Sequence, residues 1–273
     1  MELDDALKLL SRTPQAPLDV AEIALRLARD EYPNVDVEAH LGELNAMAHE
    51  ARRYMNGNLN AKVTGLCRYL FHDMGFHGNV KDYYNPANSY FNMVLERRTG
   101  IPITLSALVM TVGRRAGLCV DGVGLPGHFI AKAVEGEQHV LIDPFHGGRL
   151  LSATDCENLI RQITGVVFEV SPLALEAMPT GLIVQRMLGN LKAIYMKAED
   201  YPRALTVMQR LLQLSPREAV LRRDVGMTLA RLGQFGKAVD HLRFYLDQAP
   251  EAEDKEDIES ILKRVQGRLA QWN

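Results

Sequence analysis

The chain has 273 residues, of which 47% are hydrophobic and 24% are charged. This composition is ordinary for a soluble globular protein, and the length suggests about two domains, each able to bury a core. The formal net charge of -3 gives no electrostatic footprint for nucleic acid or for an anionic membrane, so we expect neither as a partner.

The cysteines and the N-terminal residues indicate the cellular compartment of the protein. Cys67, Cys119 and Cys156 are too few and too widely spaced for a disulfide framework, which favours a reducing environment. Residues 1–5 are acidic where a signal peptide would be basic, and no apolar run reaches the length of a membrane span. We therefore expect a cytoplasmic protein.

Residues 1 to about 75 are predicted to be helical and carry no catalytic motif. Asp19 caps a helix that ends before Pro33, and another helix follows from Val37. A third helix places Cys67 on its apolar face, where a thiol serves to fill the core. We expect these helices to pack on a sheet formed later in the chain.

Histidines at the end of this region raise the question of a metal site. The candidate ligands are His72, His77, His128, Asp143 and His146. His72 and His77 are five positions apart, which does not put both on one helical face, and no His-Glu-x-x-His spacing is present. We expect polar loop histidines, with no metal and no cofactor.

The segment 78–92 is unusual for its tyrosines and asparagines, which cluster around Pro86. Beside a cleft, such aromatic rings and amides could bind a peptide through apolar faces and hydrogen bonds. Alternatively, an Asn-Pro turn caps a helix, and Tyr84 and Tyr90 pack beneath it. The candidate binding residues are Asn79, Tyr83, Tyr84, Asn85, Asn88 and Tyr90.

The centre of the chain is predicted to be a helix followed by short strands. Thr99 and Gly100 close a preceding helix, and a new helix runs from Pro102 to Ala116 and stops at Gly117. Segments rich in valine and isoleucine follow, separated by turns that contain glycine. The predicted strands are residues 118–123, 128–134 and 140–142.

Side chains capable of chemistry accompany this pattern. A nucleophile at a helix start feels the positive end of the helix dipole, a histidine can take its proton, and a carboxylate can orient that histidine. His128 begins one predicted strand, and Asp143 follows it by 15 positions at the end of another. The hydroxyls near the helix start belong to Thr104 and Ser106.

Several motifs of this region occur together in a fixed order. They are GFHGN at 75–79, DYYNPANSY at 82–90, LERRTGIPIT at 95–104, GHF at 127–129 and DPFHGG at 143–148. The set closely resembles a bacterial family that joins a transglutaminase-like domain to tetratricopeptide repeats and is often labelled uncharacterised or an invasion regulator. A related core resembles part of a eukaryotic F-box protein.

The resemblance implies a papain-like core, but this sequence departs from it at the nucleophile. Transglutaminase-like enzymes place a cysteine at the start of the central helix, and that position falls on Pro102 here. Thr104 or Ser106 could replace the thiol only if a base activated the hydroxyl. Otherwise Thr104 is a helix-capping residue and Ser106 a small packing residue, while His128 and Asp143 form a structural pair.

Ser171-Pro172 and Pro179-Thr180-Gly181 indicate a domain boundary near residue 180. An internal repeat follows it. The matching pairs, each 34 residues apart, are Tyr201 and Phe235, Ala204 and Ala238, and Pro216 and Pro250. This is the tetratricopeptide period, and the small alanines let paired helices approach closely. Such repeats commonly present a surface for peptides or partner proteins.

The predicted fold is therefore α+β. N-terminal helices and a transglutaminase-like, papain-like core with a small antiparallel sheet occupy residues 1–180, and two tetratricopeptide repeats with a capping helix form an all-α domain at residues 181–273. One functional hypothesis is a non-catalytic peptide- or protein-binding module with a regulatory role. The alternative is a hydrolase or acyltransferase of amide bonds, with Ser106 or Thr104 as nucleophile, His128 as base and Asp143 as orienting group.

Overall fold

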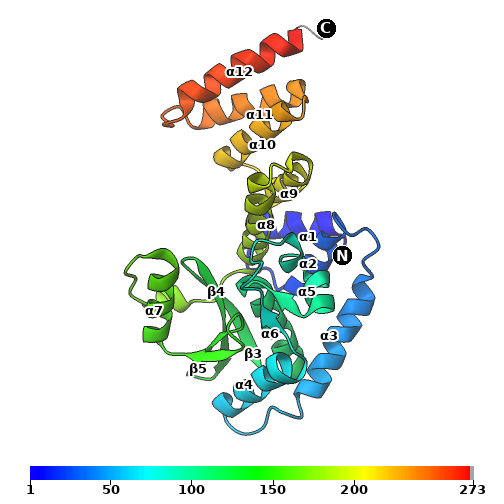
Figure 1. The fold of residues 1–273 in the computed structure, drawn as a ribbon, viewed down its shortest axis with the longest axis vertical. Coiled ribbons are helices and arrows are strands. Elements are labelled where there is room, and N and C mark those ends of the chain that lie inside the picture. Colours follow the sequence, from blue (N-terminus) through cyan, green and yellow to red (C-terminus); the bar gives the residue numbers. More distant parts are fainter. Residues whose placement is uncertain (271–273) are drawn as a thin grey trace. The chain divides into compact units, whose positions relative to one another are not determined.

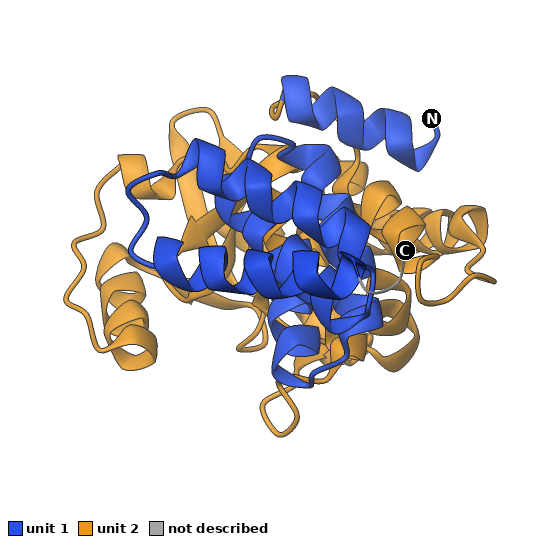
Figure 2. Ribbon diagram, turned by 90° about the horizontal axis from the view of Figure 1, so that it is seen from above, with its two compact units in different colours: residues 1–13, 188–273 blue, residues 14–187 orange. Residues whose placement is uncertain are grey.

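The computed structural model describes residues 1–270. The chain divides into two compact units, one formed by residues 14–187 and the other by residues 1–13 with 188–273 (Figure 2). The division falls within helix α8, Thr180–Lys197. The boundary predicted near residue 180 lies at the start of the same helix.

The unit formed by residues 14–187 combines helices with a four-stranded sheet (Figure 1). Its α-helices before α8 are α2 (Val20–Ala28), α3 (Val37–Ala51), α4 (Leu59–Cys67), α5 (Phe91–Arg97), α6 (Pro102–Ala116) and α7 (Ala153–Thr164). A π-helical segment, Arg68–Asp73, continues α4, and short 3-10 turns form at Pro86–Asn88 and Leu173–Leu175. Asp19 caps α2 as predicted, because its carboxylate accepts a hydrogen bond from the Ala21 N–H at 2.9 Å.

The sheet is an antiparallel meander in chain order. Its strands are β3 (Cys119–Leu125), β4 (His128–Glu135), β5 (Gln138–Asp143) and β6 (Arg149–Leu151). The first three are the predicted strands, with ends shifted by one or two residues. Strand β6 was missed, because a three-residue edge strand with exposed side chains carries no clear alternating pattern.

Both faces of the sheet are covered by helices. Helix α6 packs on β3 and β4, where Gly122 leaves room for the ring of Phe129. On the opposite face, Cys156 and Ile160 of α7 share a core with Ile130. Phe129 and Ile130 are successive residues of β4, so their side chains point to opposite faces. Burial on both sides accounts for the nearly continuous apolar run of this strand.

One local prediction is corrected. Thr99 and Gly100 do not close α5, which ends at Arg97 and is followed by Arg98 in the left-handed region at φ 53°. Thr99–Gly100 is instead strand β2, which pairs in parallel with β1, His77–Gly78. Gly100 is required for close packing, because a Cβ there would lie 2.8 Å from the Thr104 hydroxyl.

The other unit is helical and carries the repeat. Helices α9 (Tyr201–Leu214), α10 (Ala219–Arg231), α11 (Phe235–Gln248) and α12 (Lys255–Ala270) follow α8. Ala204 and Ala238 are completely buried, as expected for residues at close helix crossings. Gly226 has the same role between α10 and α11, since a Cβ there would lie 2.8 Å from the Leu242 side chain.

Helix α1, Leu3–Arg12, belongs to this helical unit. It packs on α9, and its Asp4 carboxylate pairs with the Arg210 guanidinium at 2.7 Å. The prediction from the sequence assigned α1 to the first domain instead. It missed the packing of α1 on α9, because contacts between segments so far apart in the chain leave no local sequence pattern. Within the described residues, no helix has the length and apolarity needed to cross a membrane.

The buried alanines give a prediction about the repeat. Ala238→Leu inserts three carbons where no space is left, and should lower the free energy of unfolding by about 1–3 kcal/mol. Urea denaturation followed by circular dichroism measures the change. Lys237→Leu, at the exposed neighbouring position of the same helix, serves as the control. Equal stability of the two variants would contradict close packing at Ala238.

Candidate functional site

His128 and Asp143 form a buried pair on adjacent strands. His128 is the first residue of β4 and Asp143 is the last residue of β5. His128 Nε2 and Asp143 Oδ1 are 3.1 Å apart, and the two side chains are each only 2% exposed. The structure thus brings together the two residues that the sequence proposes as base and orienting group.

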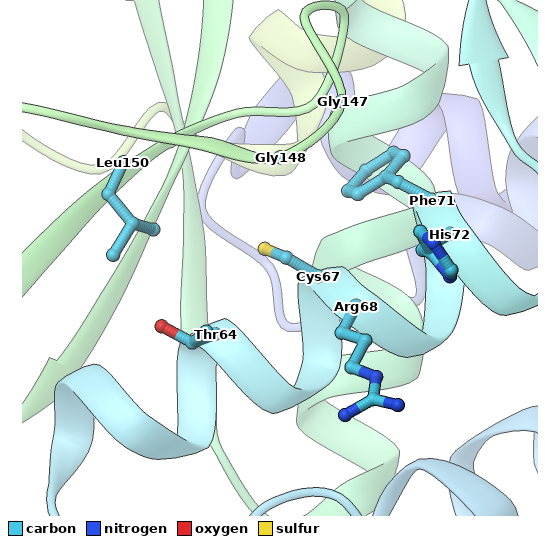
Figure 3. Close-up of a pocket in the computed structure, with 8 residues that line it drawn as sticks. All are labelled: Thr64, Cys67, Arg68, Phe71, His72, Gly147, Gly148 and Leu150. Atoms are coloured by element: carbon cyan, nitrogen blue, oxygen red, sulfur yellow. The ribbon is translucent and has the colours of Figure 1, made fainter.

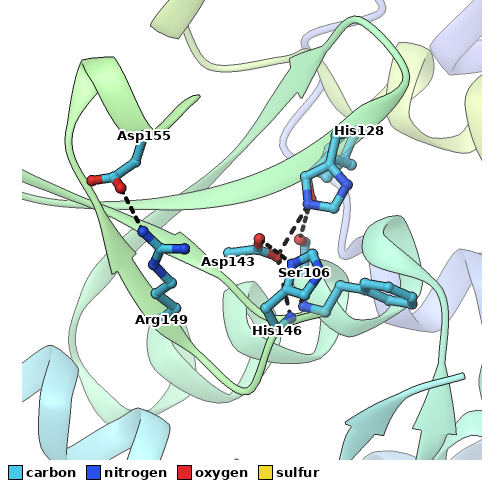
Figure 4. A network of polar contacts seen from close by, with 8 residues as sticks. Ser106, His128, Asp143, His146, Arg149 and Asp155 are labelled. Atoms are coloured by element: carbon cyan, nitrogen blue, oxygen red, sulfur yellow. Dashed lines mark hydrogen bonds and ion pairs between the residues drawn. The ribbon is translucent and has the colours of Figure 1, made fainter. Parts of the chain in front are cut away.

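A second histidine, which the sequence analysis did not include among the catalytic candidates, contacts the same carboxylate. His146 Nδ1 lies 2.6 Å from Asp143 Oδ2, and its side chain is 47% exposed. Figure 4 shows His128 and His146 approaching Asp143 from two sides. The signal in the sequence was the short spacing from Asp143 to His146, because a turn after the strand returns the third residue to the carboxylate.

The two histidines keep Asp143 ionised. Burial acts to raise the pKa of this carboxyl, but hydrogen bonds and electrostatic attraction from His128 and His146 outweigh it and hold the pKa below its usual value. The backbone N–H groups of Phe145 and His146 also donate to Oδ1, at 3.2 and 3.4 Å. A buried negative charge is therefore fixed in place from several directions.

Two glycines fix the turn that carries His146. Gly148 has φ +76°, and a Cβ there would lie 2.6 Å from the Phe71 ring and 2.8 Å from Cys67. A Cβ at Gly78 would lie 2.4 Å from the Phe145 carbonyl oxygen. The Gly147–Gly148 segment lies beside Cys67 and Phe71 (Figure 3). These residues line a pocket of about 550 Å³. The glycines allow backbone and side chains to pack at distances that no other residue permits.

Arg186 of α8 holds the start of β4. Its guanidinium donates hydrogen bonds to the carbonyls of Leu125 and His128, at 3.0 and 2.5 Å, and lies over the Phe129 ring at 5.4 Å. Burial lowers the pKa of Arg186. Sequence reasoning missed this residue, because its contacts come from a helix far along the chain.

The two candidate hydroxyl nucleophiles lie in the core. Thr104 and Ser106 are both 0% exposed. The Thr104 hydroxyl donates to the Asn88 carbonyl at 2.9 Å and accepts from the Ile101 N–H at 3.1 Å, as a helix-capping residue does. The Ser106 hydroxyl donates to the Phe129 carbonyl at 3.3 Å.

A cleft opens beside His128. It has a volume of about 440 Å³ and is lined by Tyr83, Tyr84, Pro102, Gly127, His128, Phe145, His146, Leu159, Gln162 and Ile163. Pro102, at the position where the resemblance expects a cysteine, therefore faces the same space as His128. None of the three cysteines, all within the described residues, is among the lining residues.

The tyrosine- and asparagine-rich segment divides into cleft residues and loop-forming residues. Only Tyr83 and Tyr84 line the cleft. Asn85 caps the 3-10 turn, and Asn88, completely buried, donates to the carbonyls of Asp82 and Tyr83. Asn79 bonds to the Asn88 side chain at 3.1 Å, and Tyr90 packs edge-on against Tyr32 in the core. The asparagines and Tyr90 thus shape the loop.

A His–Asp pair on adjacent strands, beside the start of a buried helix, is the arrangement of a transglutaminase-like core. The sequence model described as the transglutaminase-like superfamily matches residues 38–189, and a tetratricopeptide-repeat model matches residues 191–264. The chain therefore belongs to the transglutaminase-like superfamily, with a tetratricopeptide-repeat region after it. This confirms the family resemblance and the α+β fold expected from the sequence. Tetratricopeptide repeats typically mediate protein interactions.

Relatives occur in bacteria and in mammals. A UPF0162 protein of Xylella fastidiosa (strain Temecula1) is 33% identical over 250 residues, which cover 88% of each chain. F-box only protein 21 of Mus musculus is 34% identical over 161 residues, which cover 55% of this chain and 25% of the mouse protein. The crystal structure of menin covers 94% of this chain and 73% of its own at 10% identity and a TM-score of 0.39.

The contacts of this site predict that Asp143 and His146 contribute unequally to stability. Asp143→Ala leaves the buried His128 ring without its partner, and should lower the free energy of unfolding by about 3 kcal/mol. His146→Ala removes a half-exposed group and should cost less than about 1 kcal/mol. Chemical denaturation at neutral pH measures both values. Equal losses would contradict the assignment of His128 and Asp143 as the structural pair.

The cysteines give a second prediction. Burial raises the pKa of Cys67 to about 12, and burial with nearby carboxylates raises that of Cys156 to about 11, whereas Cys119 is exposed. A thiol-reactive disulfide reagent at pH 8 should therefore modify one thiol per native chain quickly. Cys119→Ser should abolish this fast phase. Fast modification of a second thiol would contradict the burial of Cys67 and Cys156.

Proposed function

We propose that this protein is a non-catalytic binding module of the cytoplasm, with a regulatory role, whose cleft takes a peptide segment of a partner protein. The observation that carries the proposal is the lining of the cleft. Rings of Tyr83, Tyr84 and Phe145 gather beside His128, and Pro102 stands where the superfamily would supply a thiol. Such a site has surface for binding but lacks the usual group for acyl transfer.

The aromatic cluster is suited to a peptide. The Tyr83 ring packs edge-on against the rings of Tyr84 and Phe145, with centroids 5.3 and 5.8 Å away. Tyr84 is 63% exposed and Tyr83 is 36% exposed. Rigid rings with phenol hydroxyls offer apolar contact at a small entropic cost, together with hydrogen bonds to a peptide backbone.

The helical unit supports binding with a different chemistry. A cavity of about 650 Å³ there includes Met227 and Val265 among its apolar lining, and it carries the charges of Arg231, Arg264 and Arg268. Among the described residues, no carboxylate forms an ion pair with these three guanidinium groups. An acidic segment with an apolar side chain complements this surface.

The alternative function, hydrolysis or acyl transfer by a hydroxyl, needs a nucleophile that reaches both His128 and the substrate. Thr104 and Ser106 instead donate to backbone carbonyls and are completely buried. These contacts favour binding over catalysis of this type.

Peptide selection tests the cleft. Peptides selected from a random displayed library against the full chain should include aromatic or aliphatic sequences that lose at least about tenfold in affinity with Tyr84→Ala. Fluorescence anisotropy measures the affinities. Val80→Ser changes another exposed apolar residue of the same loop, which does not line the cleft, and should have no effect. Failure to select any peptide, or equal effects of the two variants, would contradict the proposal.

The arginines give a separate prediction for the repeats. Acidic peptides from the same selection should bind at least about tenfold more weakly to the Arg264→Glu, Arg268→Glu double variant, and more weakly as salt is raised. Lys263→Glu reverses an exposed charge beside Arg264 outside the cavity and serves as the control. If the control weakens binding as much, general surface charge explains the result.

A further inference from the structure

Three potential metal-binding atoms meet at the edge of the cleft. One nitrogen each from His128 and His146 and one carboxylate oxygen of Asp143 lie within 4.8 Å of one another. Figure 4 shows the two histidine rings on either side of the Asp143 carboxylate. All three residues are among the candidate ligands in the sequence, but we expected no metal there, because they do not share one helix or a short metal-binding motif. They come from the start of β4, the end of β5 and the following turn.

These atoms are close enough together for side-chain rotations to bring them around one ion. Bonds from a transition metal to nitrogen or oxygen ligands are about 2.0–2.2 Å long, so neighbouring ligand atoms lie about 3.0–3.5 Å apart in octahedral or tetrahedral geometry. His128 Nε2 lies 3.1 Å from Asp143 Oδ1, and His146 Nδ1 lies 2.6 Å from the other carboxylate oxygen, Oδ2. An ion would be bound after rotations that turn one carboxylate oxygen and one nitrogen of each histidine toward it.

The donor set selects the type of metal. Two imidazole nitrogens and one carboxylate oxygen suit Zn²⁺ or Fe²⁺, whereas Mg²⁺ and Ca²⁺ prefer shells made of oxygen. The carboxylate supplies one negative charge, and imidazoles bind metals in the neutral form. The carboxylate would therefore balance part of the charge of a divalent cation, at a site where His128 and Asp143 are buried.

The surroundings both orient the ligands and leave room for others. Backbone N–H groups of Phe145 and His146 hold Asp143 Oδ1, as outer hydrogen bonds commonly do for metal-binding carboxylates. His128 and His146 face the aromatic cleft, while Asp143 and His146 also line an adjoining cavity of about 440 Å³. There the carboxylate of Asp155 is paired with Arg149. Three protein ligands would therefore leave positions for water or for a donor atom of a bound peptide.

We propose that His128, Asp143 and His146 bind one divalent transition-metal ion of the Zn²⁺ or Fe²⁺ type, with its open positions facing the cleft. This inference goes beyond the proposed peptide binding and does not rest on it. Hydrogen bonds alone would hold the same three side chains together, and the two arrangements differ in whether a metal binds at a defined stoichiometry.

Metal titration of the full chain tests the proposal. The protein is first dialysed against a chelator, then titrated with Co²⁺ under visible absorption and with Zn²⁺ by calorimetry. We expect one site per chain with micromolar or tighter affinity, and a Co²⁺ spectrum of nitrogen and oxygen ligands without a thiolate charge-transfer band. His146→Ala should weaken binding at least about tenfold.

The control uses a second His–Asp contact. His72 Nδ1 lies 3.0 Å from Asp73, outside the cluster, and its side chain is 83% exposed. His72→Ala should leave metal affinity unchanged, while circular dichroism confirms that each variant is folded. The absence of stoichiometric binding below about 1 mM would overturn the proposal, as would stoichiometric binding that His146→Ala leaves unchanged or a thiolate band. Neither result affects the peptide-binding test, which is measured without added metal.

Discussion

The Asp143 carboxylate is almost completely buried, and a buried charge is tolerated only when partners replace the water it has lost. Those partners are the His128 ring, the His146 ring and two backbone N–H groups of the turn. Together they fix the end of β5 against the start of β4. The carboxylate therefore helps to shape the cleft, because His128 and His146, which both contact it, are lining residues.

Under the proposed function, this constraint explains why the pair persists without the chemistry it serves in enzymes of the superfamily. Loss of a nucleophile from the start of α6 removes a reactive atom but leaves no buried group unpaired. Pro102 fits the first turn of a helix, where its missing N–H costs nothing. Loss of Asp143 would instead leave the buried His128 without its partner. Membership of the superfamily therefore identifies the fold more securely than it identifies a reaction.

The sequence predicted the features that depend on local patterns. The three main strands, the helix from Pro102, the cap at Asp19 and the 34-residue repeat each leave a periodic or punctuating signal. The features it missed depend on contacts between distant segments. Arg186 reaches β4 from α8, and Gly100 belongs to a short parallel pair with His77–Gly78. Such contacts exist only after the chain has folded.

The candidate site was predictable in part for the same reason. His128 begins β4 and Asp143 ends β5. Because the two strands form an antiparallel hairpin, these two positions lie close together. Whether a side chain of α6 faces the cleft or the core depends on how the helix is rotated against the sheet, which apolar periodicity in a helix buried on all sides does not determine. Thr104 and Ser106, which face the core, could therefore not be assigned from their positions at the helix start.

The central claim is that the cleft keeps its His–Asp pair but contains no activated nucleophile. Its most direct test is labelling of the purified, folded chain with a fluorophosphonate probe, beside Ser106→Ala, Thr104→Ala and His128→Ala variants. We predict no stoichiometric labelling of the unaltered protein. Stoichiometric labelling that disappears both in one hydroxyl variant and in His128→Ala would contradict the account and establish a hydroxyl-dependent enzyme.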